Sequence, residues 1–263
     1  MVFKKYIFNL ALLLLIIALK ASAQKASVCG EILYKQETNF SMYYERNFLM
    51  AFNNKESYYE ETNIKASRSI VKNEYSEDGL TKKNLIGRKN LTPSFYYNNK
   101  NDFYFMEMWF DEPLTVKEAQ YQLIWKLYPE TKKIGSFLCT KATTRFRGRD
   151  YIAWFTNKIP VPFGPWKFKD LPGLILEVYD TDNVFHILAQ KIKITQALNC
   201  YIDFDTIKVN SPLTIRTYLK RIKELVNEDL ARISSKMGRT KTLRIDESCD
   251  DCSESIELFK KEN

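Results

Sequence analysis

Histidine is almost absent from this chain, in which His186 is the only one among 263 residues. Zinc centres built from several imidazoles are therefore excluded, and any Ser-His-Asp or Cys-His device would have to use this one residue. The sequence also lacks a GxSxG nucleophile elbow, a phosphate-binding loop and a dinucleotide fingerprint. We therefore assign no catalytic, metal-binding or cofactor-binding residues, expect no cofactor, and favour a protein that is not an enzyme.

Long apolar runs are also scarce, and the one that stands out lies at the N-terminus. Lys4 and Lys5 precede an apolar run from Leu10 to Leu19, and Ala21-Ser22-Ala23 follows. This order is typical of a cleaved secretory signal peptide over residues 1–23, because the apolar core is short for a membrane anchor. We expect export to the periplasm, the cell envelope or the medium, with no transmembrane segment after cleavage.

Neither the charge nor the cysteines indicate a specialised partner. The formal net charge is +8, but Lys and Arg are scattered among Asp and Glu, which argues against nucleic acid as a partner. The five cysteines are Cys29, Cys139, Cys200, Cys249 and Cys252. Their odd number leaves the disulfide pairing open, even in an oxidising compartment. The last two lie in the acidic run DESCDDCSE, which favours a structural disulfide or a metal-binding tail over redox chemistry.

Most of the chain after the signal peptide has the pattern of β-strands. Aromatic and β-branched residues alternate with polar ones in a series of runs. We predict strands at 28–34, 40–52, 56–62, 102–110, 122–127, 136–146, 151–155, 174–179 and 184–194. Turn residues at 147–150 and 180–183 predict two hairpins. No helical period separates these strands, so the sheet should be antiparallel.

The period changes to that of a helix at residues 211–235. Ser211 can cap this helix, Pro212 suits its first turn, and apolar residues then recur at three and four positions. The fold class is therefore mainly β: a curved antiparallel sheet or partly open β-barrel with one C-terminal amphipathic helix packed on it. Residues 24–238 form a single domain in this interpretation, and residues 239–263 form a charged, loosely ordered tail.

The most distinctive segment lies between two predicted strands and contains Pro160, Pro162, Pro165 and Pro172. It ends in Asp170-Leu171-Pro172-Gly173-Leu174-Ile175, which resembles the motif of the GLPGLI family of exported Bacteroidetes proteins, with Asp170 in place of the first glycine. The resemblance implies an exported domain. Because family genes often lie beside TonB-dependent receptors, it also implies a partner of an outer-membrane receptor.

The proline-rich segment has two physical interpretations. Prolines cannot donate a backbone hydrogen bond, so residues 159–171 do not form a central strand. Phe163, Trp166 and Phe168 either anchor a rigid, self-packed crossover, which we favour, or form an aromatic platform for a ligand or partner. Leu171-Pro172-Gly173-Leu174 has the order of a type II turn, which requires a positive φ at Gly173. Asp170 tolerates a left-handed conformation.

These features lead to an expected function without catalysis. We expect an exported binding or accessory module of the cell envelope that holds a lipid-like or other hydrophobic ligand, with an accessory subunit of a TonB-dependent receptor as the alternative. A hydrolase or redox enzyme using His186 or the Cys249/Cys252 pair is the third hypothesis, favoured only by a cleft that places His186 beside an acid and a hydroxyl. The candidate binding residues are Arg145, Arg147, Arg149, Trp154, Phe163, Trp166, Phe168, Asp170, Leu171, Pro172, Gly173, Leu174 and Ile175.

The tail gives a first prediction. Truncation after Gly238 should shift the thermal midpoint by less than about 2 °C, because charged termini without apolar periodicity contribute little packing energy. The measurement is thermal unfolding of the full and the truncated chain in parallel. A large loss of stability would show that Cys249 and Cys252 are tied into the core.

Overall fold

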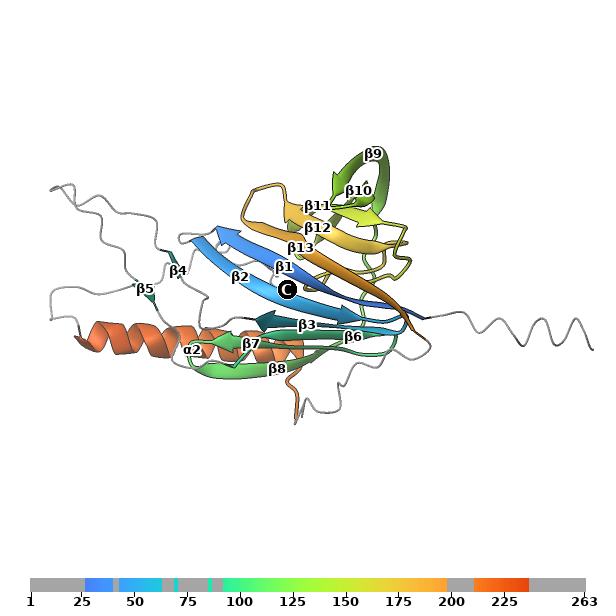
Figure 1. Ribbon diagram of the computed structural model, residues 1–263. Helices are drawn as coiled ribbons and strands as arrows, with labels where there is room; N and C mark the ends of the chain where they lie inside the picture. Colours follow the sequence, from blue (N-terminus) through green and yellow to red (C-terminus); the bar gives the residue numbers. More distant parts are fainter. Residues whose placement is uncertain are drawn as a thin grey trace, which may run out of the picture.

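The computed structural model describes residues 27–39, 43–62, 69–70, 85–86, 92–197 and 211–236. The predicted signal peptide, the tail after Gly238, and Cys200, Cys249 and Cys252 lie outside these residues. The described strands and helix, labelled in Figure 1, are β1 (Ser27–Asn39), β2 (Tyr43–Phe52), β3 (Glu56–Thr62), β4 (Ser69–Ile70), β5 (Leu85–Ile86), β6 (Phe95–Asn99), β7 (Phe103–Trp109), β8 (Glu112–Glu118), β9 (Lys126–Ile134), β10 (Phe137–Phe146), β11 (Arg149–Thr156), β12 (Leu174–Asp180), β13 (Phe185–Ala197) and α2 (Ile215–Lys236).

One antiparallel sheet organises the described chain. Its strand order is β8-β7-β6-β3-β2-β1-β13-β12-β11-β10-β9, and the two-residue strands β4 and β5 attach beside β2. The sheet bends, so that β3, β6, β7 and β8 lie below β10, β11 and β12 in Figure 1. The prediction of a mainly β fold, with a curved, unclosed antiparallel sheet and one C-terminal helix packed on it, is confirmed.

The two faces of the sheet differ in burial. Along β1, Ile32 and Tyr34 are completely buried, whereas Lys35 and Glu37, which follow at the alternate positions, are only half-buried. Successive strand residues point to opposite faces, so the first pair lies on the inner side of the bend and the second on the outer side. Across the bend, the Tyr34 hydroxyl donates to the carbonyl oxygen of Ile175 at 2.6 Å. The apolar core therefore occupies the inner side.

The proline-rich segment between β11 and β12 fills much of this inner side. Six of its apolar side chains are at most 5% exposed: Ile159, Val161, Phe163, Trp166, Phe168 and Leu171. Burying each of these stabilises the fold by about 1.5–3 kcal/mol relative to an exposed side chain. The Trp166 ring meets Phe185 edge-on at 5.2 Å. The segment is thus a self-packed connection, and its aromatic rings do not form an exposed platform.

Charged groups are also buried beneath this segment. The Lys167 side chain is completely buried and lies 3.3 Å from the Glu118 carboxylate, which Arg147 also contacts. The Lys167 ammonium sits 3.9 Å from the centre of the Phe105 ring. Burying an ammonium group costs several kcal/mol, about as much as a carboxylate partner and an aromatic face can recover together. This ion cluster therefore fixes the segment against β7 and β8.

Two predicted segments differ from the structure. The hairpin between β10 and β11 was expected to have a four-residue connection, but Phe146 pairs directly with Arg149. Arg147 and Gly148 form a two-residue loop with φ of 48° and 83°, as the twist of tight hairpins requires. The strand predicted at 122–127 is also wrong, because β9 begins at Lys126. Its hydrophobic residues instead bind the proline-rich segment, with Trp125 Nε1 donating to the Lys169 carbonyl oxygen at 2.8 Å.

The turn predicted at Gly173 is wrong as well. Among the described glycines, positive φ occurs at Gly135 and Gly148 but not at Gly173, so the type II turn is not formed. The glycine is required for space: a Cβ there would lie 2.7 Å from the carbonyl carbon of Thr156 and 3.0 Å from the amide nitrogen of Asn157. Asp170 does adopt the left-handed conformation, with φ of 72°.

Helix α2 packs on the β8 end of the sheet. It begins at Ile215, and Thr214 rather than the predicted Ser211 caps it, since Thr214 Oγ1 accepts from the Thr217 amide at 3.2 Å. The Tyr218 hydroxyl donates to Glu107 at 2.6 Å, which joins the helix to β7. Within the described chain, no helix has the length and hydropathy needed to span a bilayer.

The close approach at Gly173 gives a second prediction. Gly173→Val should lower the free energy of unfolding by more than about 1 kcal/mol, because the new side chain would overlap the backbone of β11. Gly135→Ala is the matched control. A Cβ added there has no atom within 4 Å, so the only expected cost is that of an alanine at the positive φ of 57°. Urea denaturation measures both. Equal midpoints for Gly173→Val and the parent would contradict the proposed contact.

Candidate functional site

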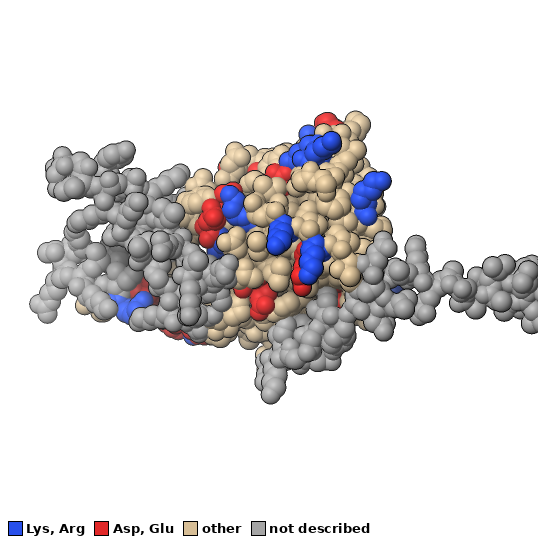
Figure 2. Space-filling model, viewed as in Figure 1, with Lys and Arg blue, Asp and Glu red and all other residues tan. Residues whose placement is uncertain are grey.

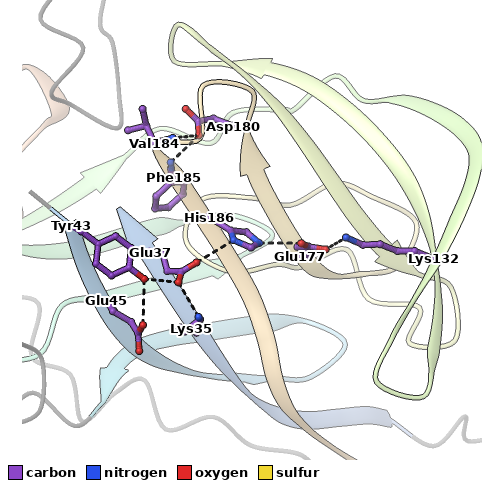
Figure 3. A network of polar contacts seen from close by, with 10 residues as sticks. All are labelled: Lys35, Glu37, Tyr43, Glu45, Lys132, Glu177, Asp180, Val184, Phe185 and His186. Carbon is purple, nitrogen blue, oxygen red and sulfur yellow. Dashed lines mark hydrogen bonds and ion pairs between the residues drawn. The ribbon is translucent and has the colours of Figure 1, made fainter. Parts of the chain in front are cut away.

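The only histidine lies on the outer face of the sheet, in a row of polar and aromatic residues that crosses four strands. Strand pairing places Glu45 opposite Glu37, Glu37 opposite His186, and His186 opposite Tyr179. Phe185 and Ile187 flank His186 in β13 and are completely buried, so the alternation of the strand directs the imidazole outward. Figure 3 shows this polar cluster on β1, β2, β12 and β13, with a lysine reaching it from β9.

Two carboxylates flank the imidazole of His186. Its Nδ1 lies 3.2 Å from Glu37 Oε2, and its Nε2 lies 3.0 Å from Glu177 Oε1 (Figure 3). The two contacts, one on each ring nitrogen, hold the imidazole in one orientation.

Further partners hold the two carboxylates in place. The Tyr43 hydroxyl and the Lys35 ammonium donate to Glu37 Oε1 at 2.5 and 2.9 Å. Lys132 forms an ion pair with the other oxygen of Glu177. The Lys132 ammonium also lies over the Trp154 ring, 4.5 Å from its centre. Each acid thus has a fixed position and a cationic neighbour.

These contacts shift the pKa values of the cluster. For Glu37 and Glu177, burial alone would raise the carboxyl pKa, but the hydrogen bonds from Tyr43 and Lys35 to the first, and from His186 and Lys132 to the second, outweigh it. The pKa of both carboxyl groups is therefore lowered. Burial and the hydrogen bond to Glu37 raise the pKa of the Tyr43 phenol. Both acids are ionised at neutral pH, and Tyr43 keeps its proton.

The cluster lines an open cleft of about 510 Å³. Its wall also includes Asn39, Tyr179 and Asn183. The Oδ1 atom of Asn39 is buried and has no hydrogen-bond partner among the described residues. The cleft thus combines two ionised carboxylates, an imidazole, an aromatic ring and the unpaired Asn39 oxygen. This combination suits the binding of a small polar substrate and the transfer of protons.

The predicted binding residues lie elsewhere, apart from Trp154. Each of the three arginines has a carboxylate partner: Arg145 pairs with Asp150 at 2.8 Å, Arg149 pairs with Asp180 at 3.2 Å, and Arg147 contacts Glu118. The motif aromatics Phe163, Trp166 and Phe168 are buried in the core, as are Leu171, Leu174 and Ile175.

No sequence pattern predicted a role for Glu37 or Glu177. Glu37 lies in β1, where buried and half-buried residues alternate, but Glu177 lies in β12, which is buried almost throughout and shows no such alternation.

Two further properties limit the chemistry. Among the described residues, no group of three or more His, Cys, Asp or Glu side chains is arranged to hold a metal ion. On the face shown in Figure 2, basic and acidic side chains are interspersed among uncharged ones.

Cys29 is disulfide-bonded, whereas Cys139 is a free, buried thiol whose pKa burial raises to about 11. Cys139 is therefore a poor nucleophile.

Comparison with known proteins gives one family match. Residues 114–217 match the model of the N-terminal domain of N-glycanase peptide, PNGase F-II. This match covers less than half of the chain. A search of curated proteins gives no match.

Solved structures of PNGF-II also match. The structure in space group P21 has 18% sequence identity and a TM-score of 0.45, with 76% of this chain and 34% of that chain covered. The structure in space group C2 has 18% identity and a TM-score of 0.44, with coverages of 76% and 33%. This chain spans about a third of the PNGF-II chains that it matches.

The glycanase match corrects the expected function. A non-catalytic binding or accessory module of the envelope, whether it holds a hydrophobic ligand or serves a TonB-dependent receptor, disagrees with similarity to the domain of a glycanase. The physical basis of that expectation also fails, because the inner side of the sheet is filled by Trp166 and its aromatic neighbours, whereas an apolar ligand needs an open concavity. The resemblance to the GLPGLI family stays a prediction.

Proposed function

We propose that this protein is a hydrolase domain that acts on glycan-bearing substrates, with the cleft around His186 as its catalytic site. The observation on which this rests is the position of His186 between two ionised acids, in an open cleft beside the hydroxyl of Tyr43. Side chains in such contact are the usual means of general acid–base catalysis. The match to an N-glycanase domain supports a glycan-bearing substrate.

The geometry supports a division of roles among three residues. His186 donates the proton of Nδ1 to the leaving atom of the scissile bond, which replaces Glu37 Oε2 as the acceptor of that N–H. Glu37 is ionised and half-buried, so it can take a proton from the attacking water. Glu177 is more deeply buried and paired with Lys132, and it keeps the imidazole in place. The hydroxyl of the water adds to one side of the broken bond, its proton goes to Glu37, and the proton of His186 goes to the leaving side. Transfer of the proton from Glu37 to Nδ1 then restores His186.

We also propose that the protein acts outside the cytoplasm. The predicted signal peptide and the disulfide bond of Cys29 support this location, because disulfides persist in oxidising compartments.

Enzymatic assay tests the proposed site directly. The chain should release glycan from a fluorescently labelled glycopeptide. Chromatography of the products measures the rate of this release. His186→Gln and Glu37→Gln should each lower the rate by about a hundredfold or more, the usual contribution of a general acid or base. Glu31→Gln is the matched control, since Glu31 is an exposed glutamate on the same strand and face. Turnover that persists in both variants, or its absence in the parent, would refute the proposal.

The lowered pKa values of Glu37 and Glu177 predict a dependence of stability on pH. Because folding favours the ionised carboxylates, their stabilisation is fully present above the unfolded pKa of about 4.3. It is lost as the pH falls through the lower folded values. The free energy of unfolding should therefore decline in this acidic range, and less steeply in Glu177→Gln than in the parent. Urea unfolding between neutral pH and about pH 3 measures this, and parallel declines would contradict it.

A further inference from the structure

A second cavity lies apart from the His186 cleft, at the rim of the sheet. It has a volume of about 690 Å³, within the usual range for ligand pockets. Four parts of the chain enclose it: the turn that joins β2 to β3, the turn that joins β6 to β7, the connection after β8, and the proline-rich segment. None of its lining residues belongs to the catalytic cleft.

Side-chain amides are numerous in the lining of this cavity, which we term the amide pocket. Five of its twelve lining residues are Asn54, Asn98, Asn99, Asn101 and Gln120. Each amide offers donors and an acceptor without a charge. Pro162 and Phe163 add an apolar patch to the wall. Such a surface fits a neutral molecule with many hydroxyl or amide groups and an apolar face.

Contacts within the protein position these groups. The Asn99 side chain accepts from the amides of Asn101 and Asp102 at 2.8 and 2.7 Å, which fixes the β6–β7 turn. Gln120 donates to the Asn99 carbonyl oxygen at 2.9 Å and accepts from the Lys169 ammonium. The pocket is therefore preorganised, because its groups are held before any ligand arrives.

One buried atom in the pocket indicates what the ligand must provide. Asn98 is 8% exposed, and its Oδ1 has no hydrogen-bond partner among the described residues. A buried acceptor without a partner is costly, so proteins retain one mainly where something else supplies the donor. The ligand must therefore bring an O–H or N–H group, which a fully ionised anion lacks.

The charged groups of the pocket are largely engaged by the protein. The Lys169 ammonium lies 4.6 Å from the centre of the Tyr121 ring, in addition to its contact with Gln120. Asp170 accepts from the Leu123 amide at 3.0 Å, and Glu56 accepts from the Tyr97 hydroxyl at 2.6 Å. This leaves Lys55 and Lys100 at the rim, too few charges to favour an anion over a neutral ligand.

We propose that the amide pocket binds an N-acetylated sugar residue of a glycan. The acetamido N–H or a ring hydroxyl donates to Asn98 Oδ1, the other amides bind the remaining hydroxyl groups, and the C–H face of the sugar packs on the exposed ring of Pro162. This inference rests on the proposed function only in taking a glycan as the ligand. The pocket would give the enzyme a second point of attachment to its substrate.

Calorimetric titration tests the pocket independently of catalysis. The probe is triacetylchitotriose, added to the His186→Gln variant so that no turnover interferes, with maltotriose and inorganic phosphate as comparisons. We expect triacetylchitotriose to bind more tightly than maltotriose, which has no acetamido group, and phosphate not to bind. Asn98→Leu should weaken binding of triacetylchitotriose at least tenfold. The thermal midpoint of the Asn98→Leu protein should equal or exceed that of its parent, because the substitution removes a buried acceptor without a partner.

Two further variants protect the test from misfolding. Asn101→Ala changes an exposed turn residue and should also weaken binding, whereas Gln190→Ala, exposed on β13, should leave it unchanged. Equal affinity in Asn98→Leu and its parent, preferred binding of phosphate, or no binding of either sugar would overturn the inference. Binding without any hydrolysis by the unmodified chain would overturn the proposed function alone, and hydrolysis without binding at Asn98 would overturn this inference alone.

Discussion

The fold depends on how the proline-rich segment closes the inner side of a bent sheet. Its prolines cannot join the sheet as strand residues, since they have no N–H to donate. The segment instead bonds to the start of β12, where Leu174 and Ile175 donate to the carbonyl oxygens of Ile159 and Phe163 at 2.9 and 3.1 Å. An antiparallel sheet needs a second layer over its apolar face. Here an irregular segment provides that layer, where many folds use a second sheet or several helices.

This arrangement leaves the outer face and the rim for chemistry. Successive strand residues point to opposite faces, so the residues that alternate with core positions lie on the outer face. His186 lies between the buried residues Phe185 and Ile187, and Glu37 lies between Gln36 and Thr38, which are also buried. The strands that hold the core thus also hold the polar cluster around His186, and the rigid core keeps these side chains in position.

Local patterns predicted more of the fold than of the site. The strand at 56–62, the hairpin between β12 and β13 and the C-terminal helix follow from periodicity and turn residues close in sequence. The segment at 122–127 was mistaken for a strand because its apolar residues serve a contact with the distant Lys169 backbone. Likewise, Glu37 meets His186 only through the pairing of β1 with β13, which no local pattern specifies. Gly173 was predicted to need a positive φ, which it does not adopt; its constraint is the close backbone of Thr156 and Asn157, which the turn pattern does not reveal.

The buried charges connect the core with the rim. Lys167 and its partner Glu118 lie in the core, and two residues further along each segment Lys169 contacts Gln120 at the amide pocket. Removing one partner of a buried ion pair leaves an uncompensated charge and costs about 3–5 kcal/mol, more than replacing both with apolar residues. The pair therefore locks the register between the connection after β8 and the proline-rich segment. Since that register places both Gln120 and Lys169, the geometry of the pocket is set by an electrostatic contact in the core.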